Sequence, residues 1–523
     1  MHLVRSRWAG ALALSLSMAA AADAQGPVAA PRGSPDQFTV PATQAPAPIS
    51  REEFAGRRRA LAETLGDGVL LALGALEPES DYMPFSQNSP FRYLTGVTEP
   101  GAALVMVKQG GRTREMLFVT PRDPSREVWE GARLGSDAAT RLTGIPARSA
   151  EGLMAALDSL LSGSVTLYTI SPLGSDGSRL EFLRPDQQVV QALKREHPQI
   201  RVEDASEKLF RIRSVKSPAE LDMLRRSVLI TTLAHREAMR AVEPGMNEFE
   251  IQALIEATFR RFGAERPSFG SIVGSGPNST TLHYNKADRF MQAGETLVMD
   301  IGSAYNGYAA DVTRTVPVSG RFSPEQRQVY EVVLAAQKAA EQQAGRGVSF
   351  GAISQTAARV VSEGLARLGL IEAADATYDC GRGGAQKCPQ YRLFYMHGLG
   401  HGIGLDVHDP EAAYAEYGGV FAVGSAFTIE PGIYVRADVL DYLPDTPTNR
   451  AMKERIRGTV ERYRNIGVRI EDDYFVTANG VERVTQHAPR EIAEIEALMA
   501  QESFWNRERR PEIVEWYRGI TPH

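Results

Sequence analysis

Two aspartates in apolar, strand-like runs are the residues of this sequence with the clearest chemical potential. Asp300 lies in the run 297–303, and Asp311 lies in the run 308–316. A carboxylate among core-type residues is costly to bury unless it has a partner. A solvent-exposed face is the alternative explanation for both residues. If the face is buried, the two like charges repel each other, and a divalent cation would neutralise them.

The two runs are joined by Asn306-Gly307, the pair most typical of a type I′ hairpin turn. Such a turn predicts that Asp300 pairs with Thr313 across the hairpin. Because side chains alternate along paired strands, Asp300 and Asp311 are then diagonal neighbours on one face, within roughly 8 Å.

Further candidates for chemistry lie in three motifs nearer the C-terminus. His401 is in a glycine-rich segment, which would let the backbone approach an ion closely. Glu430 ends an apolar run just before Pro431, and Glu471 shares one face of an alternating run with Arg469. Taken singly, each could be a structural or solvated residue. Four carboxylates embedded in apolar strand sequence are harder to explain in that way.

The chain that must position these residues has 523 residues, of which 43% are hydrophobic and 23% are charged. These fractions are ordinary for a soluble globular protein, and the length predicts two or three domains. The formal net charge of −6 gives no electrostatic footprint for nucleic acid, so no nucleic-acid partner is expected. Beyond the N-terminal segment there is no apolar run of about 20 residues, so no membrane anchor is expected.

The N-terminal segment has the pattern of a secretory signal peptide. Arg5 lies in a positively charged start, an alanine- and leucine-rich segment follows, and a small-residue cleavage site ends at Ala24. A membrane anchor is the alternative, but the apolar segment is short and rich in alanine. We therefore expect an exported protein, either periplasmic or secreted.

The rest of the chain divides by pattern. Helical stretches alternate with short apolar strands in the first half, which predicts an α/β domain. In the second half, Ser217 and Ser323 begin capping boxes with proline at the first helical position, so long helices should start there. Residues 390–480 are predicted to form strands joined by glycine-rich loops. The predicted divisions are a signal peptide (1–24), a disordered Pro/Ala-rich leader (25–50), the α/β domain (51–212), a second domain (213–500) and a C-terminal extension (501–523).

Four ordered motifs resemble the metal motifs of Xaa-Pro aminopeptidases (aminopeptidase P): MDIGSAYNGYAADVTRT, HGLGHGIGLDVHD, TIEPGIYV and GVRIEDD. Upstream, FSQNSPFRYLTGVTEPGAALVMV and RDPSREVWEGARLG resemble that family's N-terminal domain. The family belongs to the pita-bread metallopeptidases, together with prolidase and methionine aminopeptidase. The resemblance implies an α/β N-terminal domain followed by an α+β pita-bread (creatinase/aminopeptidase-like) catalytic domain.

The resemblance also implies a dimetal site. Its expected ligands are Asp300, Asp311, His401, Glu430 and Glu471. The intact set argues against the non-catalytic relatives of this fold and against creatinase, which works without metal. Four carboxylates and one imidazole carry about four negative charges, which match two divalent cations, and oxygen-rich ligation favours Mn²⁺, with Zn²⁺, Co²⁺ or Fe²⁺ as alternatives.

By the same resemblance, the protein would hydrolyse the bond between an N-terminal residue and a following proline. A metal-bridging hydroxide would be the nucleophile, and Glu430 would shuttle its proton to the proline nitrogen. Arg469 would orient Glu471. Asp409 would either support the imidazole of His408 or be structural. The residues expected on the substrate side are His283, His397, His408, Tyr434 and Trp129.

In some relatives the counterpart of Trp129 reaches a neighbouring subunit, which implies a homo-oligomer, either a dimer or a tetramer. Two segments depart from the family pattern. One contains Cys380 and Cys388, for which export predicts a local disulfide, with two free thiols as the alternative. The other, 436–464, is long and similar to that of prolidase, so a dipeptidase remains an alternative activity. A non-catalytic peptide-binding module is the third possibility.

Overall fold

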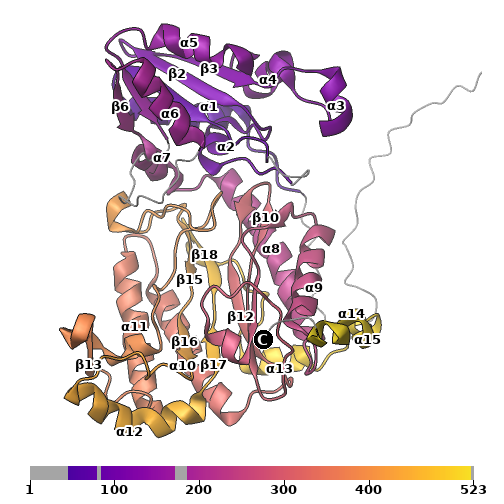
Figure 1. Ribbon diagram of the computed structural model, residues 1–523, viewed down its shortest axis with the longest axis vertical. Helices are drawn as coiled ribbons and strands as arrows, with labels where there is room; N and C mark the ends of the chain where they lie inside the picture. The colour runs from indigo at the N-terminus through magenta and orange to yellow at the C-terminus, as the bar shows by residue number, and fades with distance from the viewer. Residues whose placement is uncertain (1–44, 79–83, 171–184, 520–523) are drawn as a thin grey trace, which may run out of the picture. The chain divides into compact units, whose positions relative to one another are not determined.

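The computed structural model describes residues 45–78, 84–170 and 185–519 (Figure 1). The expected signal peptide and nearly all of the expected leader lie outside these ranges. Within them, no helix is both long and apolar enough to cross a membrane.

The N-terminal half contains a six-stranded mixed sheet in the order β4-β3-β2-β1-β5-β6. Strands β1, β2 and β3 pair antiparallel, whereas β5 and β6 extend the sheet in parallel from β1, and β4 pairs in parallel with β3. The strands are β1 (Gly68–Leu73), β2 (Ala103–Gln109), β3 (Arg112–Val119), β4 (Ala147–Ser149), β5 (Thr166–Thr169) and β6 (Arg201–Asp204). The helices are α1 (Arg51–Thr64), α2 (Ser89–Thr95), α3 (Pro124–Glu130), α4 (Gly135–Thr143), α5 (Leu153–Leu160), α6 (Pro185–Glu196) and α7 (Ser206–Arg213).

The second half begins with a long helix at the predicted start. Ser217 and Ser323 form the expected capping boxes with Glu220 and Gln326, and Gly369 ends α11 in the left-handed region. The helices are α8 (Pro218–Ala241), α9 (Glu248–Arg261), α10 (Pro324–Gln343), α11 (Phe350–Leu368), α12 (Pro447–Tyr463), α13 (Ile492–Met499), α14 (Phe504–Arg507) and α15 (Pro511–Glu515).

The strands of this half lie between helix pairs (Figure 1). Helix α8 packs on β10, β11 and β12 and α9 on β7 and β8, while α10 packs on β15, β16 and β17. The strands are β7 (Arg266–Pro267), β8 (Ile272–Ser275), β9 (Thr296–Ile301), β10 (Ser303–Tyr305), β11 (Tyr308–Ala309), β12 (Val312–Pro317), β13 (Thr377–Cys380), β14 (Gln386–Pro389), β15 (Ala426–Ile429), β16 (Gly432–Val435), β17 (Ile466–Arg469), β18 (Asp472–Thr477) and β19 (Gly480–Arg483). An α/β half followed by an α+β half is the predicted fold class.

The predicted hairpin register is confirmed. Asp300 pairs with Thr313 between β9 and β12, and the turn residues Asn306 and Gly307 have φ of 49° and 79°. These positive φ values are those of a type I′ turn, which explains the Asn-Gly sequence. The turn therefore fixes the face on which Asp300 and Asp311 lie.

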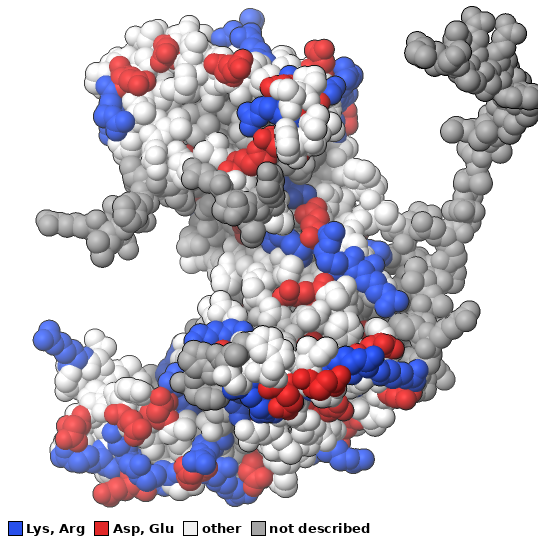
Figure 2. All heavy atoms as spheres, turned by 45° about the vertical axis from the view of Figure 1, so that its right-hand side comes forward, with Lys and Arg blue, Asp and Glu red and all other residues white. Residues whose placement is uncertain are grey.

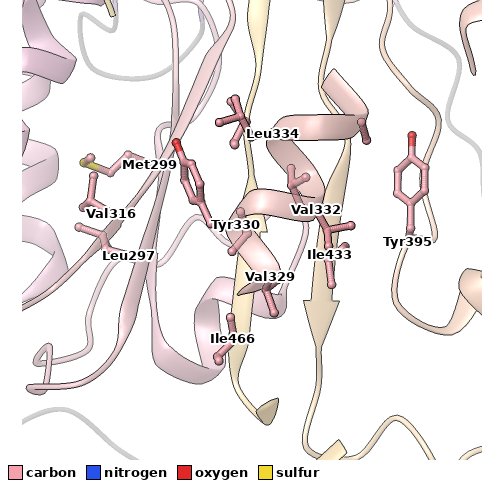
Figure 3. Packing of buried hydrophobic residues seen from close by; sticks show 14 of the residues in the cluster. Leu297, Met299, Val316, Val329, Tyr330, Val332, Leu334, Tyr395, Ile433 and Ile466 are labelled. Atoms are coloured by element: carbon pink, nitrogen blue, oxygen red, sulfur yellow. The ribbon is translucent and has the colours of Figure 1, made fainter. Parts of the chain in front are cut away.

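Helix α10 supplies the centre of the main hydrophobic core. Val329 and Tyr330 are fully buried between Leu297 of β9 on one side and Ile433 of β16 on the other (Figure 3). Burying a side chain of this size stabilises the fold by about 1.5–3 kcal/mol. The core thus joins the strand that carries Asp300 to the strands beyond α10.

One prediction for this half is wrong. Residues 390–480 contain the 17-residue helix α12 within the segment expected to form strands and loops. Thr446 caps it by accepting from the backbone N–H of Asn449, and Pro447 is at its first turn. Its buried positions Met452, Ile456 and Val460 recur at helical spacing. The surrounding charged residues obscure that period in the sequence.

The expected disulfide is present and links β13 to β14. The hairpin is attached to the start of α12, because Asp379 accepts from Thr446 Oγ1 at 2.6 Å. Asn449 Nδ2 also donates to the carbonyl oxygen of Asp379 at 2.9 Å. The two segments that depart from the family pattern therefore pack against each other.

Surface charges form mixed pairs. On the face drawn in Figure 2, acidic and basic side chains are interspersed. Several are neighbours on one helix, such as Arg126 with Glu130 at 3.0 Å. Exposed pairs of this kind contribute only about 0–1 kcal/mol each, so the core contributes far more stability.

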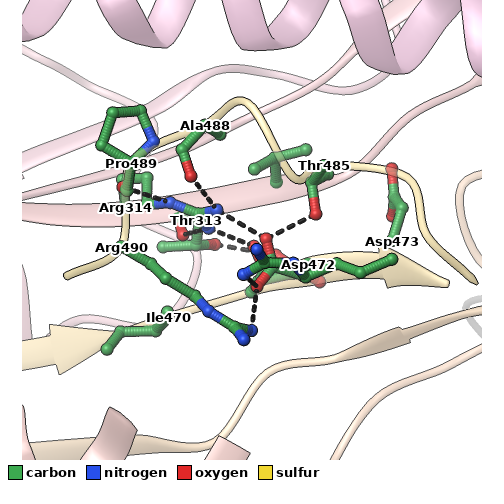
Figure 4. Close-up of polar contacts among 12 residues, drawn as sticks. Thr313, Arg314, Ile470, Asp472, Asp473, Thr485, Ala488, Pro489 and Arg490 are labelled. Atoms are coloured by element: carbon green, nitrogen blue, oxygen red, sulfur yellow. Dashed lines mark hydrogen bonds and ion pairs between the residues drawn. The ribbon is translucent and has the colours of Figure 1, made fainter. Parts of the chain in front are cut away.

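A buried ion pair joins β12 to β18 (Figure 4). Arg314 and Asp472 are both fully buried, and Arg314 Nη2 is 2.5 Å from Asp472 Oδ1. Arg490 Nη1 donates to the other oxygen of Asp472 at 2.8 Å, and Thr485 Oγ1 also donates to this carboxylate. Although burial alone would raise the pKa of Asp472, the guanidinium groups of Arg314 and Arg490 lower it to about 2.

Replacing Arg314 by Met should lower the free energy of unfolding by about 3–5 kcal/mol, because it leaves a buried carboxylate short of a partner. Urea denaturation of the metal-free protein measures this change. Arg462→Met is the matched control, since Arg462 pairs with Glu325 on the surface and its loss should change the free energy of unfolding far less. Equal losses in the two variants would contradict the buried-pair explanation.

Candidate metal centre

The structure brings together all five residues that the sequence predicts as metal ligands. The ligand atoms of Asp311, His401 and Glu471 lie within 4.8 Å of one another. His401 Nε2 is 3.4 Å from Asp311 Oδ2 and 3.5 Å from Glu430 Oε1. Asp300 lies beside Asp311 in the wall of one cavity, and its charge helps to raise the pKa of Asp311. The result is one compact group of carboxylates around one imidazole.

Each carboxylate is placed by the end of a strand. Asp300 is the next-to-last residue of β9, and Asp311 directly precedes β12. Glu430 directly follows β15, where Pro431 interrupts the strand, and Glu471 lies in the break between β17 and β18. Ligands from four chain segments therefore meet where several strands begin or end.

The loop that carries His401 lies directly against β15. A Cβ atom at Gly400 would be 2.3 Å from the carbonyl oxygen of Thr428, so only glycine permits this approach. The backbone N–H of His401 donates to Thr428 Oγ1 at 3.1 Å, and His401 Nδ1 donates to the carbonyl oxygen of Gly402 at 3.1 Å. This second contact leaves Nε2 as the lone-pair nitrogen facing the carboxylates.

Arg469 is buried behind the cluster, where it binds Asp300 rather than Glu471. Its Nη2 atom is 2.5 Å from Asp300 Oδ2. Arg469 reaches Glu471 only through Thr313, which accepts from Arg469 Nε at 3.3 Å and donates to Glu471 Oε2 at 2.8 Å. Any orienting effect of Arg469 on Glu471 therefore acts through Thr313. The cause is the break between β17 and β18, which ends the regular alternation assumed for this run.

The cluster has unpaired oxygens that fit divalent cations. Among the described residues, the buried atoms Asp300 Oδ1, Asp311 Oδ1 and Glu471 Oε1 have no hydrogen-bond partner. Burial and the neighbouring carboxylates raise the pKa of Asp311 and of Glu471 well above the ordinary values. Burial also raises the pKa of Glu430 to about 8. Crowded oxygen ligands without donors are what a hard divalent cation binds.

A cavity of about 510 Å³ opens onto these ligands. Its wall includes the three histidines that the sequence places on the substrate side: His283, His397 and His408. His397 is already engaged at both nitrogens, because Nδ1 donates to the carbonyl oxygen of Gly398 at 2.7 Å and Nε2 accepts from Tyr434 Oη at 2.9 Å. His283 and His408 make no side-chain hydrogen bond to the residues that the structure describes. Of these three histidines, His283 and His408 therefore present ring nitrogens that are free to contact a substrate.

Two residues expected near the substrate are not part of this wall. Tyr434 is fully buried behind it, where its hydroxyl accepts from Arg469 Nη1 at 2.9 Å. Trp129 in α3 is 76% exposed. Its expected role involves a second copy of the chain and stays a prediction.

Other parts of the wall were missed by the sequence analysis. Phe269, Leu282 and Val407 supply apolar surface, and Asn285 supplies an amide. They lie in loops without periodicity, so no sequence signal marks them.

Asp409 is structural. It does not support the ring of His408 but forms a buried ion pair with Arg213, and Lys216 Nζ is 3.2 Å from its Oδ2. Arg213 also binds Asp406 at 2.7 Å. The chain just before α8 is thus attached to the loop that carries His408.

Comparison with known proteins places this geometry in a family. Residues 222–478 match the model of metallopeptidase family M24, and residues 54–168 match the aminopeptidase P N-terminal domain. The chain is 35% identical over 458 residues to an Xaa-Pro aminopeptidase of Haemophilus influenzae, covering 87% of this chain and 98% of that protein. The chain belongs to the metallopeptidase family M24. An M24 relative from Escherichia coli, also an Xaa-Pro aminopeptidase, is 35% identical over 466 residues, with 86% and 98% covered.

Solved structures of aminopeptidase P share the fold. Escherichia coli aminopeptidase P, solved as a variant in complex with substrate, matches with a TM-score of 0.72 at 32% identity, over 87% of this chain and 99% of that chain. Proline aminopeptidase P II from Yersinia pestis matches with a TM-score of 0.72 at 32% identity, over 86% and 100%. The predicted pita-bread fold is therefore confirmed, and membership of M24 implies divalent metal ions at the cluster.

Replacing Glu471 by Ala should remove metal and activity together, because it deletes a buried ligand that is only 1% exposed. Metal analysis after dialysis, alongside a peptidase assay, measures both. Glu482→Ala in β19 is the control, since Glu482 pairs with Arg225 at the surface and should leave both unchanged. A Glu471→Ala protein with the wild-type metal content would contradict the ligand assignment.

Metal binding should release protons and should weaken as the pH is lowered. Carboxyl groups whose pKa is raised, such as Glu430 at about 8, are protonated below that pH, and a cation must displace the proton. Titration calorimetry with Mn²⁺ in buffers of different ionisation enthalpy counts the protons. Glu430→Gln should release fewer protons than wild type. An affinity independent of pH between 6 and about 8 would refute this expectation.

Proposed function

We propose that the protein is an exported Xaa-Pro aminopeptidase that removes an N-terminal residue from peptides with proline at the second position. The carrying observation is the cluster of five ligands at the base of a cavity, in a chain related along nearly its whole length to proteins named Xaa-Pro aminopeptidases. We propose two divalent cations, with Mn²⁺ favoured by the oxygen-rich ligands and Zn²⁺, Co²⁺ or Fe²⁺ as alternatives.

When bound, the cations would polarise the scissile carbonyl and lower the pKa of the water that attacks it. Glu430 is the residue that would move the proton. Its carboxyl group faces both His401, at 3.5 Å, and His397, at 3.9 Å. A carboxyl group whose pKa is raised to about 8 both accepts and returns a proton near neutral pH, so it would take the proton of the water and deliver it to the proline nitrogen.

The histidines divide into two roles. His408 faces the cavity beside His401, with ring centroids 4.2 Å apart, and burial lowers its pKa. A neutral imidazole with an unengaged N–H would donate to the developing oxyanion. His397 has no nitrogen left for the substrate, so it would shape the wall and hold Tyr434 in place.

Prolidase remains the second candidate because residues 436–464, which include α12, form a long connection. The match of residues 54–168 to the aminopeptidase P N-terminal domain favours longer peptides. Turnover of any Xaa-Pro substrate would reject the non-catalytic alternative.

Export and assembly are also part of the proposal. The pattern of residues 1–24 supports passage through a signal peptide, and the Cys380–Cys388 disulfide suits a periplasmic or secreted protein. The exposed pair Val128 and Trp129 supports a homo-oligomer.

Substrate length tests the proposal directly. After chelation and reloading with Mn²⁺, the protein should release arginine from Arg-Pro-Pro, as measured by chromatography of the products. Gly-Pro serves as the dipeptide comparison. Cleavage of Gly-Pro alone would establish a prolidase instead, and full metal occupancy without turnover of either would indicate a binding module.

Replacing His408 by Ala should leave the metal content unchanged and lower kcat by about 10²–10³-fold, the usual cost of losing one oxyanion donor. His197→Ala is the matched control, because His197 pairs with Asp158 on the surface of the N-terminal half. Loss of metal from His408→Ala would show that His408 is a ligand rather than a substrate residue.

A further inference from the structure

We infer that Glu248 is a positioning residue that holds the loop 276–289 in place and thereby sets the position of His283 in the cavity. The inference rests on the proposed function, since His283 matters only if the cavity binds substrate. Glu248 itself is not part of the cavity wall.

Glu248 is fully buried in the first turn of α9 and accepts hydrogen bonds from five donor groups. Oε1 accepts from Ser275 N at 2.6 Å, from Ser275 Oγ at 2.7 Å and from Asn278 Nδ2 at 3.2 Å. Oε2 accepts from Tyr284 Oη at 2.8 Å and from Arg289 N at 3.1 Å. All five donors come from one stretch of chain, which runs from Ser275 at the end of β8 to Arg289 before β9.

This stretch depends on such contacts for its shape. As described, residues 276–289 contain one short 3₁₀ turn, η2 (Gly276–Thr280), and otherwise irregular backbone. Their ends are drawn together by Glu248, because Ser275 precedes the loop and Arg289 closes it. The backbone N–H of Glu248 also donates to the carbonyl oxygen of Arg289 at 2.9 Å. One side chain therefore fixes the start, the middle and the end of the loop.

The loop faces the cavity on its other side. Leu282, His283 and Asn285 line the cavity, whereas Tyr284, between them, directs its hydroxyl to Glu248. Displacing Tyr284 would move both neighbours. The position of His283 is thus linked to the carboxylate through a single intervening residue.

A carboxylate suits this site better than an amide. An ionised carboxylate accepts at both oxygens, and the first turn of a helix favours negative charge. In Glu248→Gln one of the two oxygens becomes an NH₂ group, which cannot accept a hydrogen bond. If it replaces Oε1, the bond from Ser275 N is lost, and if it replaces Oε2, the bond from Arg289 N is lost. The variant keeps the size of the side chain and removes the contacts at one end.

The experiment compares Glu248→Gln with wild type in hydrolysis of Arg-Pro-Pro by the Mn²⁺-loaded enzyme. We expect unchanged metal content and a kcat/KM lower by about 10–100-fold, the usual cost of losing a supporting contact. Glu250→Gln is the control. Glu250 is in the same helical turn and accepts from the backbone N–H of Asn247 and from the guanidinium group of Arg509, but it has no hydrogen bond to residues 276–289. It should retain wild-type kcat/KM.

A double-mutant cycle with His283→Ala separates positioning from general destabilisation. If Glu248 acts through His283, Glu248→Gln should cost less than about threefold in the His283→Ala background. An equal cost in both backgrounds would overturn the inference. Glu248→Asp, which keeps the charge, provides a second variant if Glu248→Gln does not fold.

Amide hydrogen exchange keeps the test independent of the proposed function. Residues 276–289 should exchange faster in Glu248→Gln than in wild type, while β9 and β12 should not change. Wild-type protein without turnover would refute the proposed function alone. Unchanged exchange in 276–289 would refute the positioning role whatever the activity.

Discussion

Mutual repulsion among four crowded carboxylates, three of them buried and Glu430 partly exposed, is the constraint around which the second half of the protein is built. At an effective dielectric constant of about 20, two such charges 4 Å apart repel by about 4 kcal/mol. Arg469 offsets part of this by binding Asp300, whereas Asp311, Glu430 and Glu471 all lie within 4.0 Å of His401 and form no ion pair with an arginine or lysine among the described residues. In the metal-free protein, the hydrophobic core around α10 must therefore offset this repulsion.

The structure limits that repulsion by separating neighbouring acidic residues. Glu471 and Asp472 are adjacent, yet Glu471 faces the metal cluster and Asp472 faces Arg314 and Arg490. The break between β17 and β18 lies at this point. It lets two adjacent carboxylates point to different partners, one to the metal cluster and the other to the two arginines. Asp473, also buried, accepts from the backbone N–H of Asp311 at 3.3 Å and supports the ligand from behind.

Local features of the sequence predicted much of this arrangement. The Asn306-Gly307 turn gave the register that places Asp300 beside Asp311, and the capping box at Ser217 gave the start of α8. Three features were not predictable: the partners of Arg469, the bond between His397 and Tyr434, and the buried site of Glu248. Each depends on contacts between segments far apart in the chain. Helix α12 was missed although its period is present, since charged residues dominate its composition.

The ion pair between Asp409 and Arg213 has a mechanical consequence. It ties the chain entering α8 to the loop of His408, whereas the carboxylate ligands are anchored in strands of the second half. Because the backbone N–H of Asp409 donates to the carbonyl oxygen of Gly402 at 2.8 Å, a displacement along that connection would reach the substrate-side His408 and the ligand His401 together. One short loop thus couples a substrate contact and a metal ligand to the chain that enters α8.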